Sequence, residues 1–278
     1  MLLTKYKPIH YLYIYSRHED EVSLCDLETR ALFGKDADSI ILESNLDIDP
    51  SRSPFIKEKI DVLFQVETLE QLKTQLVDFV IKDHTFKVTL IKNTELEKHD
   101  KIDFKMRRNI EKNIGLLIKG TVDLNNADIT FGIMRVKTGW VFGLHQKSEA
   151  IWLHHQQKPH QYSTALSTRV ARAVVNIAVP NPANKKVIDP CCGIGTILIE
   201  ALSMGISITG RDINPLVLPG TRENISFFGY HTEVILGDIR DVCEKYDIAI
   251  VDMPYNLCSV LSTQEQLDML KKRACFCE

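Results

Sequence analysis

The sequence predicts an α/β protein in two parts, an N-terminal α+β region followed by a doubly wound parallel sheet. The chain has 278 residues, enough for two domains of ordinary size. Apolar residues make up 44% and charged residues 26% of the sequence, the balance of a folded globular protein. After residue 162, short apolar runs alternate with stretches of helical periodicity, a pattern typical of a sheet covered by helices.

The N-terminal region mixes strand and helix patterns. Residues 1–60 alternate apolar runs such as HYLYIYS with polar stretches, and SRSPF at 51–55 indicates a break. Gly120 stands where the C-cap of a helix is expected, and Lys137, Thr138 and Gly139 indicate the turn of a hairpin. The periodicities predict strands at 61–66, 85–91, 128–136 and 138–145 and helices at 68–80 and 106–120.

The C-terminal region alternates regularly between the two element types. Ser163 or Thr164 is the expected cap of its first helix, and Pro219 is expected to interrupt its last. The pattern predicts strands at 185–190, 206–212, 233–238 and 246–254 and helices at 163–178, 196–205 and 215–229. A parallel sheet of this kind carries its site at the carboxyl ends of its strands.

Charge is distributed unevenly along the chain. Residues 135–172 contain six Lys or Arg and one acid, a net charge of +5, while the rest of the chain sums to −8. An anionic partner would therefore be attracted to one part of the molecule. An ordinary solvated surface explains the same charges equally well.

Several classes of protein are excluded by what the sequence lacks. There is no run of eighteen apolar residues and no signal peptide pattern, so we expect a cytoplasmic protein. Seven cysteines without paired Cys-x-x-Cys units favour reduced thiols, and we expect no metal.

Each predicted strand of the C-terminal region ends in an acid. These acids are Asp189, Asp212, Asp238 and Asp252. Aspartate often caps the helix after a strand, which accounts for one such acid more easily than for four. Four acids at the same edge of one sheet predict a binding site.

The turn after the first of these strands reads Asp189-Pro190-Cys191-Cys192-Gly193-Ile194-Gly195-Thr196. Two glycines allow a tight turn and let backbone N–H groups approach a ligand. A dinucleotide fingerprint requires a third glycine where Leu198 stands, which argues against a pyrophosphate. With Asp212 placed for two ribose hydroxyls and Asp238 for an exocyclic amine, S-adenosylmethionine is the expected cofactor.

The last strand leads into Asp252-Met253-Pro254-Tyr255-Asn256, which resembles the Asp/Asn-Pro-Pro-Tyr motif of methyltransferases that modify exocyclic or amide nitrogens. An acceptor at Asp252 and the backbone carbonyl of Met253 would hold the target amine, and Tyr255 would stack on a flipped base. The motif usually has proline at the position of Met253, so this turn is less rigid here. The alternative is a turn that merely ends the strand.

The whole chain resembles the THUMP-domain RNA methyltransferases, closest to the tRNA guanosine N2-methyltransferases that act at position ten. Residues 106–144 are similar to the terminal half of a THUMP domain, and residues 154–178 to the family's segment ahead of its first sheet strand. The DPCCGIGT and DMPYN sequences match its cofactor and catalytic turns. The resemblance implies a ferredoxin-like region at 1–60, a THUMP RNA-binding domain at 61–152 and a class I, Rossmann-like methyltransferase domain at 160–278.

The resemblance also implies roles for individual residues. The catalytic turn would comprise Asp252, Met253, Pro254 and Tyr255. The cofactor would be bound by Asp189, Pro190, Cys191, Gly193, Gly195, Thr196, Asp212, Ile213, Asp238 and Ile239, with Tyr162, Ser163 and Thr164 closing over it. RNA phosphates would be bound by Lys119, Arg135 and Lys137. His154, His155 and His160 are expected at the surface or facing RNA, because they have no convincing fourth metal ligand.

Only 26 residues follow Asp252, fewer than the further strands of such a sheet require. We therefore expect a C-terminally shortened catalytic domain whose edge is either exposed to aggregation or completed by a partner chain or a longer form of the chain.

The leading functional hypothesis is an S-adenosylmethionine-dependent enzyme that methylates an exocyclic amine of RNA, in particular guanosine N2 of tRNA. One alternative is a non-catalytic RNA-binding protein with a degenerate methyltransferase domain. Another is methylation of DNA adenine or of a protein glutamine, which the N-terminal 150 residues argue against because neither activity requires a THUMP-like region.

Overall fold

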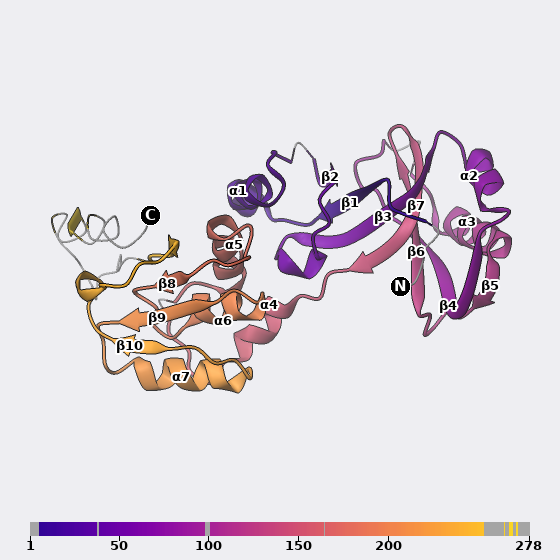
Figure 1. Cartoon of the computed structure of the whole chain (residues 1–278). Helices are drawn as coiled ribbons and strands as arrows, with labels where there is room; N and C mark the ends of the chain where they lie inside the picture. Colours follow the sequence, from indigo (N-terminus) through magenta and orange to yellow (C-terminus); the bar gives the residue numbers. More distant parts are fainter. Residues whose placement is uncertain are drawn as a thin grey trace. The chain divides into compact units, whose positions relative to one another are not determined.

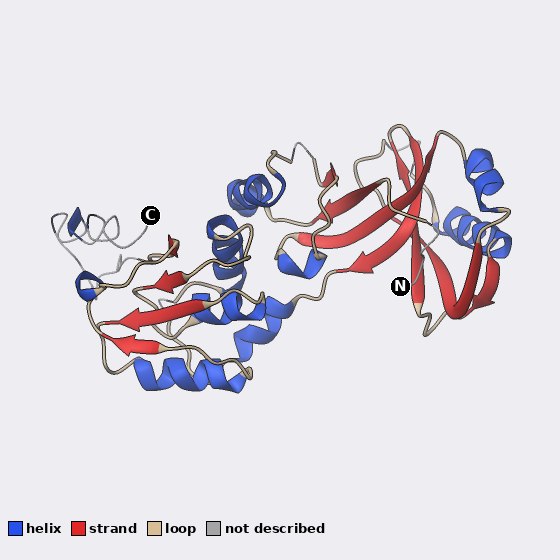
Figure 2. Cartoon of the chain, in the orientation of Figure 1, coloured by secondary structure: helices blue, strands red, loops and turns tan. Residues whose placement is uncertain are grey.

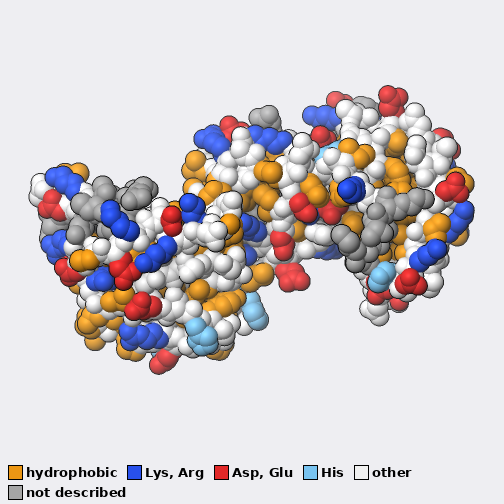
Figure 3. All heavy atoms as spheres, viewed as in Figure 1, with side chains coloured by type: hydrophobic (Ala, Val, Ile, Leu, Met, Phe, Trp, Pro, Cys, Tyr) orange, Lys and Arg blue, Asp and Glu red, His pale blue; other side chains and the backbone are white. Residues whose placement is uncertain are grey.

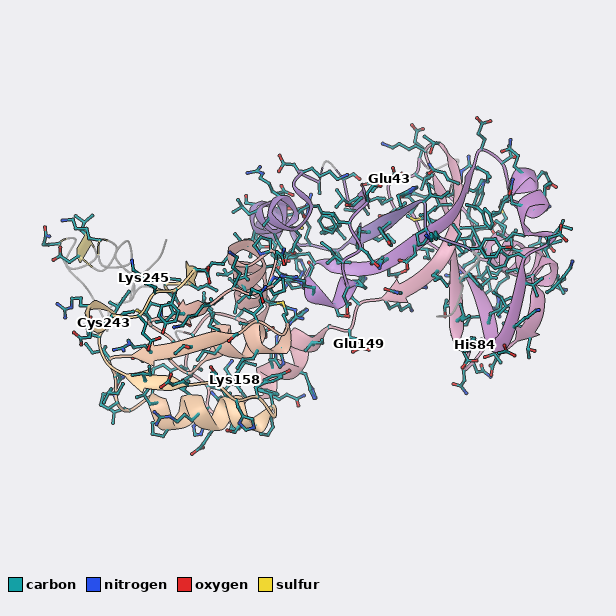
Figure 4. The ribbon with its side chains drawn as sticks, viewed as in Figure 1. Glu43, His84, Glu149, Lys158, Cys243 and Lys245 are labelled. Atoms are coloured by element: carbon teal, nitrogen blue, oxygen red, sulfur yellow. The ribbon has the colours of Figure 1, made fainter. Side chains whose placement is uncertain are left out.

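The computed structural model describes residues 6–37, 39–97, 101–163 and 165–252, together with Gln264, Leu267, Asp268 and Lys271. The chain divides into two compact units. Unit 1 comprises the described residues within 1–16, 37–51 and 55–149, and unit 2 those within 17–36, 52–54 and 150–278. Glu149, labelled in Figure 4, is the last residue of unit 1.

Unit 1 is built on a seven-stranded sheet of mixed parallel and antiparallel strands (Figure 1). The strand order is β2-β1-β3-β7-β6-β4-β5. The strands are β1 (His10–Tyr15), β2 (Ile41–Ser44), β3 (Ile56–Val66), β4 (Val80–Ile91), β5 (Lys119–Val122), β6 (Ile129–Val136) and β7 (Gly139–Lys147). Because β3 pairs with both β1 and β7, the stretches 1–60 and 61–152 share this sheet.

Two helices cover one face of the sheet of unit 1. These are α2 (Leu69–Leu76) and α3 (Phe104–Leu117), capped by the side chains of Thr68 and Asp103. Alternate side chains of the central strands meet them in an aromatic core that includes Phe79, Phe131 and Phe142. A second, smaller apolar cluster contains Leu12, Val62 and Met134. It is separate from the first because successive side chains of a strand point to opposite faces of the sheet.

The predicted elements of unit 1 are present, but strand β5 was not predicted and α2 ends four residues before the end of the helix predicted at 68–80. The hairpin is confirmed, since β6 and β7 pair up to Val136 and Gly139 with only two residues between them. The predicted C-cap at Gly120 is wrong, because α3 ends at Leu117 and Gly120 lies within β5. A Cβ on Gly120 would stand 3.0 Å from the carbonyl oxygen of Ile81 on β4, so close strand packing explains this glycine.

Unit 2 contains a four-stranded parallel sheet of order β10-β9-β8-β11. Its strands are short, as Figure 2 shows, and carry helices between them. The strands are β8 (Val187–Asp189), β9 (Ile208–Asp212), β10 (Val234–Leu236) and β11 (Ile248–Ala249). The helices of the unit are α1 (Val22–Phe33), α4 (Ile151–His154), α5 (Thr168–Ala178), α6 (Thr196–Ser203) and α7 (Leu218–Phe227), and single 3-10 turns lie at 19–21, 155–157 and 239–241.

The helices of unit 2 follow one another along the sheet. Helix α5 contacts α6, α6 contacts α7 and β9, and α7 contacts β10. A large apolar cluster that includes Val187, Leu198 and Ile225 fills the space between these elements. Residue Ile188, which points the opposite way from Val187, packs instead with Ile239 and Tyr246 in a separate cluster. The sheet therefore has apolar packing on both faces, as a parallel sheet requires.

The helix boundaries of unit 2 correct two predictions. Ser167 caps α5 by accepting from the backbone N–H of Val170, so neither Ser163 nor Thr164 begins this helix. Pro219 lies in the first turn of α7 and does not interrupt it.

Helix α1 and residues 52–54 come from the N-terminal part of the sequence but belong to unit 2 by their contacts. Helix α1 packs on α5. The domain boundaries at 60, 152 and 160 stay a prediction. Among the described residues, every helix is too short or too polar to cross a lipid bilayer.

Candidate cofactor and substrate site

The four acids expected at the carboxyl ends of the strands do lie there. Asp189 and Asp212 are the last residues of β8 and β9. Asp238 follows β10 by two residues, and Asp252 follows β11 by three. Since all four strands are parallel, these ends share one edge of the sheet.

The turn between β8 and α6 depends on its two glycines. Gly193 and Gly195 have φ of 50° and 81°, the left-handed region that favours glycine. A Cβ on Gly195 would stand 3.0 Å from Cγ2 of Thr221, whereas a Cβ on Gly193 would meet no atom within 4 Å. The turn is thus packed against α7 at Gly195 and open at Gly193.

Asp212 ties this turn to the next strand. Its Oδ2 accepts a hydrogen bond of 2.8 Å from the backbone N–H of Gly193, and its Oδ1 accepts one of 2.8 Å from that of Asn214. The backbone N–H of Cys192 donates to the carbonyl oxygen of Arg211 on the same strand. The acid on β9 and the glycine turn after β8 therefore form a single hydrogen-bonded structure.

Asp189 is 1% exposed, and its Oδ1 accepts a hydrogen bond of 3.1 Å from the backbone N–H of Cys191. Burial raises the pKa of Asp189 to about 8, and the charges of Asp252 and Asp212 act in the same direction. Burial also raises the pKa of Asp252. A cationic group placed among these carboxyl groups would stabilise their ionised forms.

Asp238 is held by Arg240, a residue that sequence reasoning did not select. The Oδ2 of Asp238 accepts hydrogen bonds from Nε and Nη2 of Arg240 at 3.0 and 2.5 Å, and its Oδ1 accepts one from the Arg240 backbone N–H at 2.8 Å. These hydrogen bonds lower the pKa of the Asp238 carboxyl group. Asp238 is therefore ionised and fixed in orientation at neutral pH.

The two cysteines of the turn are free thiols, as are the other described cysteines, Cys25 and Cys243. Burial raises the pKa of Cys191 to about 12, with the Asp189 charge adding to the effect, and burial also raises that of Cys192. Both therefore stay protonated at neutral pH and are poor nucleophiles.

Thr196 begins α6 directly after the turn and is 5% exposed. Its Oγ1 is buried without a hydrogen-bond partner among the described residues. A buried hydroxyl normally has a partner, so this atom could bond a polar group of a ligand seated on the turn.

Two buried polar residues of α7, which the sequence analysis did not select, donate hydrogen bonds to backbone carbonyl oxygens of the turn. Thr221 Oγ1 donates to the carbonyl oxygen of Gly193 at 2.5 Å. Asn224 Nδ2 donates to the carbonyl oxygens of Ile194 and His160 at 3.0 and 3.1 Å, and its Oδ1 accepts from the His160 backbone N–H. Two polar residues three positions apart on one helix could have indicated a shared polar contact. The sequence does not show which groups they contact, because Gly193 and Ile194 lie far from them in the chain.

The remaining predicted cofactor residues differ in their surroundings. Ile213 is 64% exposed next to Asp212, while Ile239 is 4% exposed and packs in the apolar cluster with Ile188. Pro190 is buried and Ser163 is exposed. Thr164, Met253, Pro254 and Tyr255 lie outside the described residues.

The three basic residues predicted to bind RNA do not form one patch. Lys119 pairs with Val80 at the start of β4 and makes an exposed ion pair with Asp78 at 3.3 Å. Arg135 follows Met134, the partner of Ile91 at the far end of β4, and Lys137 is exposed two residues later. At about 3.3 Å per residue, the length of β4 separates the two places by roughly 30 Å. On the face in Figure 3, Lys and Arg side chains are interspersed with Asp and Glu.

One of the three histidines departs from expectation. His155 is 2% exposed, and its Nδ1 lies 2.7 Å from Oε1 of the buried Glu200, so its prediction as a surface residue is wrong. His154 and His160 are exposed, and His160 Nε2 lies 2.5 Å from Glu223 Oε2. Within the described residues, no three His, Cys, Asp or Glu side chains are grouped to hold a metal ion.

Lys158, labelled in Figure 4, is another buried polar residue that the sequence did not single out. Burial lowers the pKa of its ammonium group, and the charge of Glu200 opposes that shift. It lies two residues before His160, in the segment that reaches α7.

Comparison with known proteins connects this geometry to a family. The model of the "RMKL-like, methyltransferase domain" family, UPF0020, matches residues 155–273. The tRNA (guanine(10)-N2)-dimethyltransferase of Methanothermobacter thermautotrophicus is 35% identical over 161 residues, which is 54% of this chain and 48% of that protein. The enzyme of the same name from Pyrococcus abyssi is 32% identical over 124 residues, 42% of this chain and 36% of that protein.

A solved structure covers more of the chain at lower similarity. The crystal structure of TrmN from Thermus thermophilus has a TM-score of 0.46 and 16% identity, covering 97% of this chain and 86% of that one. In sequence, the chain spans half or less of the length of the first two curated relatives. The family match covers the sheet that carries the four acids and the glycine turn. Over residues 155–273, the chain therefore resembles the methyltransferase domain of the UPF0020 family.

Proposed function

We propose that this protein is an S-adenosylmethionine-dependent RNA methyltransferase that transfers a methyl group to N2 of a guanosine in tRNA. The observation that carries this proposal is the hydrogen-bonded unit of the glycine turn and Asp212 at the carboxyl edge of a parallel sheet. The curated relatives named tRNA (guanine(10)-N2)-dimethyltransferase support the choice of substrate.

The residues at this edge fit S-adenosylmethionine. The open space at Gly193 leaves room for a ligand over the turn, and the unpaired Oγ1 of Thr196 offers it a polar contact. Asp189 would face the cationic methionine part, Asp212 would accept from the ribose hydroxyls, and Asp238 would accept from the adenine amine. When bound, this cofactor supplies an electrophilic methyl group on a sulfonium.

The substrate side of the proposal rests on Asp252. An exocyclic amine is a weak nucleophile because its lone pair is delocalised into the base, so it needs acceptors for its N–H groups during the reaction. The carboxyl group of Asp252 would accept one of these hydrogen bonds and the backbone carbonyl of Met253 the other. Tyr255 would stack on the base, and unit 1 would hold the rest of the RNA.

The test is methyl transfer from labelled S-adenosylmethionine to tRNA transcribed in vitro, followed by nucleoside analysis. We expect label in N2-methylguanosine or N2,N2-dimethylguanosine, and a matched transcript with inosine at the modified position, which lacks the 2-amino group, should accept no methyl group there. Label only in adenosine, DNA or protein would replace the proposed substrate. Tight RNA binding by a chain that binds no cofactor would favour the non-catalytic alternative.

A further inference from the structure

Unit 1 contains a cavity of about 390 Å³. It lies where β4 ends and α3 begins, two elements labelled in Figure 1. Leu90 and Ile91 from β4, Phe104 from α3 and Arg135 from β6 are among its lining residues. A volume of this size falls within the range of small-ligand pockets and suits one nucleotide.

The lining of this cavity is strongly basic. Among the described lining residues, Asp103 is the one acid, and four side chains are cationic, those of Lys92, Lys101, Arg107 and Arg135. Asp103 is already engaged, because its Oδ1 accepts from the backbone N–H of Met106 at 2.7 Å as the cap of α3. Lys92 and Lys101 are exposed and make no ion pair with any described acid. The cavity therefore favours an anionic ligand.

The two arginines are held in place by their neighbours. The guanidinium of Arg135 lies 5.7 Å from the centre of the Trp140 ring, and its backbone carbonyl accepts from Asn93 Nδ2 at 3.0 Å. Arg107 Nε donates to Glu111 Oε1 at 2.9 Å, and the same oxygen accepts from the Leu90 backbone N–H. Fixed guanidinium groups bind phosphate with a smaller loss of side-chain entropy than mobile ones.

An exposed aromatic residue, Phe104, is part of the lining of this cavity. Phe104 is 77% exposed although it opens an amphipathic helix, and it packs in neither apolar cluster of unit 1. Arg108 lies 5.9 Å from the centre of its ring. Aromatic rings beside Lys and Arg are the usual means of binding single-stranded nucleic acid, because bases stack on the ring while phosphates meet the cations.

We propose that this cavity binds one unstacked ribonucleotide of an RNA strand, with its phosphate at Lys92, Lys101, Arg107 and Arg135 and its base on Phe104. This inference rests on the proposed function in taking RNA as the partner. It locates RNA binding where β4 ends and α3 begins. Lys119 lies at the other end of β4 and would not contact the bound nucleotide. A free nucleotide has the same chemistry, so the test must separate the two sources.

The probe is a fluorescent twelve-nucleotide single-stranded RNA titrated with the full chain at several salt concentrations. Lys92→Gln and Lys101→Gln should each weaken binding about fivefold and lower the slope of log Kd against log salt by about 0.7. Phe104→Ala should weaken binding about tenfold with an unchanged slope, because stacking involves no counterion release. Lys112→Gln, on the exposed surface of α3 outside the lining, is the matched control and should change neither quantity.

Two results would overturn the proposal. One is equal affinity and slope for the lining variants and for Lys112→Gln, with thermal unfolding showing that all are folded. The other is adenosine 5′-monophosphate binding as tightly as the oligonucleotide and losing affinity in the same variants, which would make the ligand a free nucleotide. Methyl transfer by the wild-type chain is measured in parallel. If the variants bind RNA normally while the wild type transfers methyl groups, only the pocket proposal fails. If the wild type transfers no methyl group, the RNA-binding results still test the pocket.

Discussion

Arg172 and Glu200 form an ion pair inside unit 2, with Nη1 of the arginine 2.8 Å from Oε2 of the glutamate and side chains that are 1% and 0% exposed. His155 contacts the other oxygen of Glu200. Arg172 Nε also donates to the backbone carbonyl of Arg52 at 2.9 Å. Glu200 lies one turn into the helix that begins at the cofactor turn, so this pair fixes that helix against α5.

The same network explains why α1 belongs to unit 2. Asn176 Nδ2 donates to Oε1 of Glu28 on α1 at 2.6 Å, and Ser53 Oγ donates to its Oε2 at 2.5 Å. Burial raises the pKa of Glu28 to about 7, although these hydrogen bonds and the charge of Arg172 oppose the shift. Residues of the N-terminal sequence thus satisfy buried polar groups of helix α5 in unit 2.

Breaking the pair should destabilise unit 2. Arg172→Leu removes the ion-pair partner of the buried Glu200 carboxylate, and we expect a loss of about 3 kcal/mol in the free energy of unfolding. Urea unfolding in a Trp140→Phe background checks this, because Trp152 then reports on unit 2. Arg30→Leu removes an exposed pair with Asp36 and should lower the free energy of unfolding far less, because solvent screens the pair. Equal losses in the two variants would contradict the assignment.

The sequence predicted the strands and helices of unit 2 better than the capping and buried polar residues that stabilise them. Strand patterns and the acids at their ends are local signals, and the structure confirms Asp189 and Asp212 as the last residues of their strands. The cap of α5 was misplaced because Ser163, Thr164 and Ser167 all precede the same apolar pattern. Glu28 was missed since a glutamate on an amphipathic helix is normally exposed, and only tertiary packing buries it.

Thr221 should control the shape of the cofactor turn. Thr221→Val keeps the volume of the side chain but leaves the Gly193 carbonyl without this donor, a loss of about 1–2 kcal/mol. We expect S-adenosylmethionine to bind roughly tenfold more weakly, as measured by calorimetry. Thr74→Val is the control. The Thr74 hydroxyl donates to the carbonyl oxygen of Glu70 four residues earlier on α2 in unit 1, as the Thr221 hydroxyl also does to that of Val217 on α7. Unchanged affinity in Thr221→Val would show that the turn holds its shape without the hydroxyl.

Cofactor binding should release a proton from Asp189. With a pKa of about 8, this buried group is mostly protonated at pH 7, and a bound cation favours its ionised form. Affinity should therefore rise as pH increases from 6 to 8 and level off above the pKa of Asp189. The free energy of unfolding of the unbound protein changes in the opposite direction. Between pH 4 and 8 the folded state keeps a proton on Asp189 that the unfolded chain has lost, so stability falls as the pH rises through this range.

Calorimetry at pH 7 in phosphate and in Tris separates proton release from binding heat, because the two buffers differ in ionisation enthalpy. Asp189→Asn keeps an acceptor for the Cys191 backbone N–H but cannot ionise, so it should remove this part of the buffer dependence. The amino group of the cofactor contributes equally to both proteins. The idea fails if the asparagine variant and the wild type release the same number of protons.

Asp252 should separate catalysis from cofactor binding. Asp252→Ala removes the proposed acceptor for the target amine, and we expect the rate of methyl transfer at saturating substrates to fall at least about a hundredfold. Asp252→Asn retains a carbonyl oxygen and should keep part of the activity, and Met253→Pro should be tolerated because the backbone carbonyl remains. Cofactor affinity at pH 7 should stay level or rise slightly in Asp252→Ala, because the charge of Asp252 helps to raise the pKa of Asp189 and its removal eases ionisation of Asp189. Methylation by the alanine variant at the wild-type rate would show that another group accepts the hydrogen bonds of the target amine.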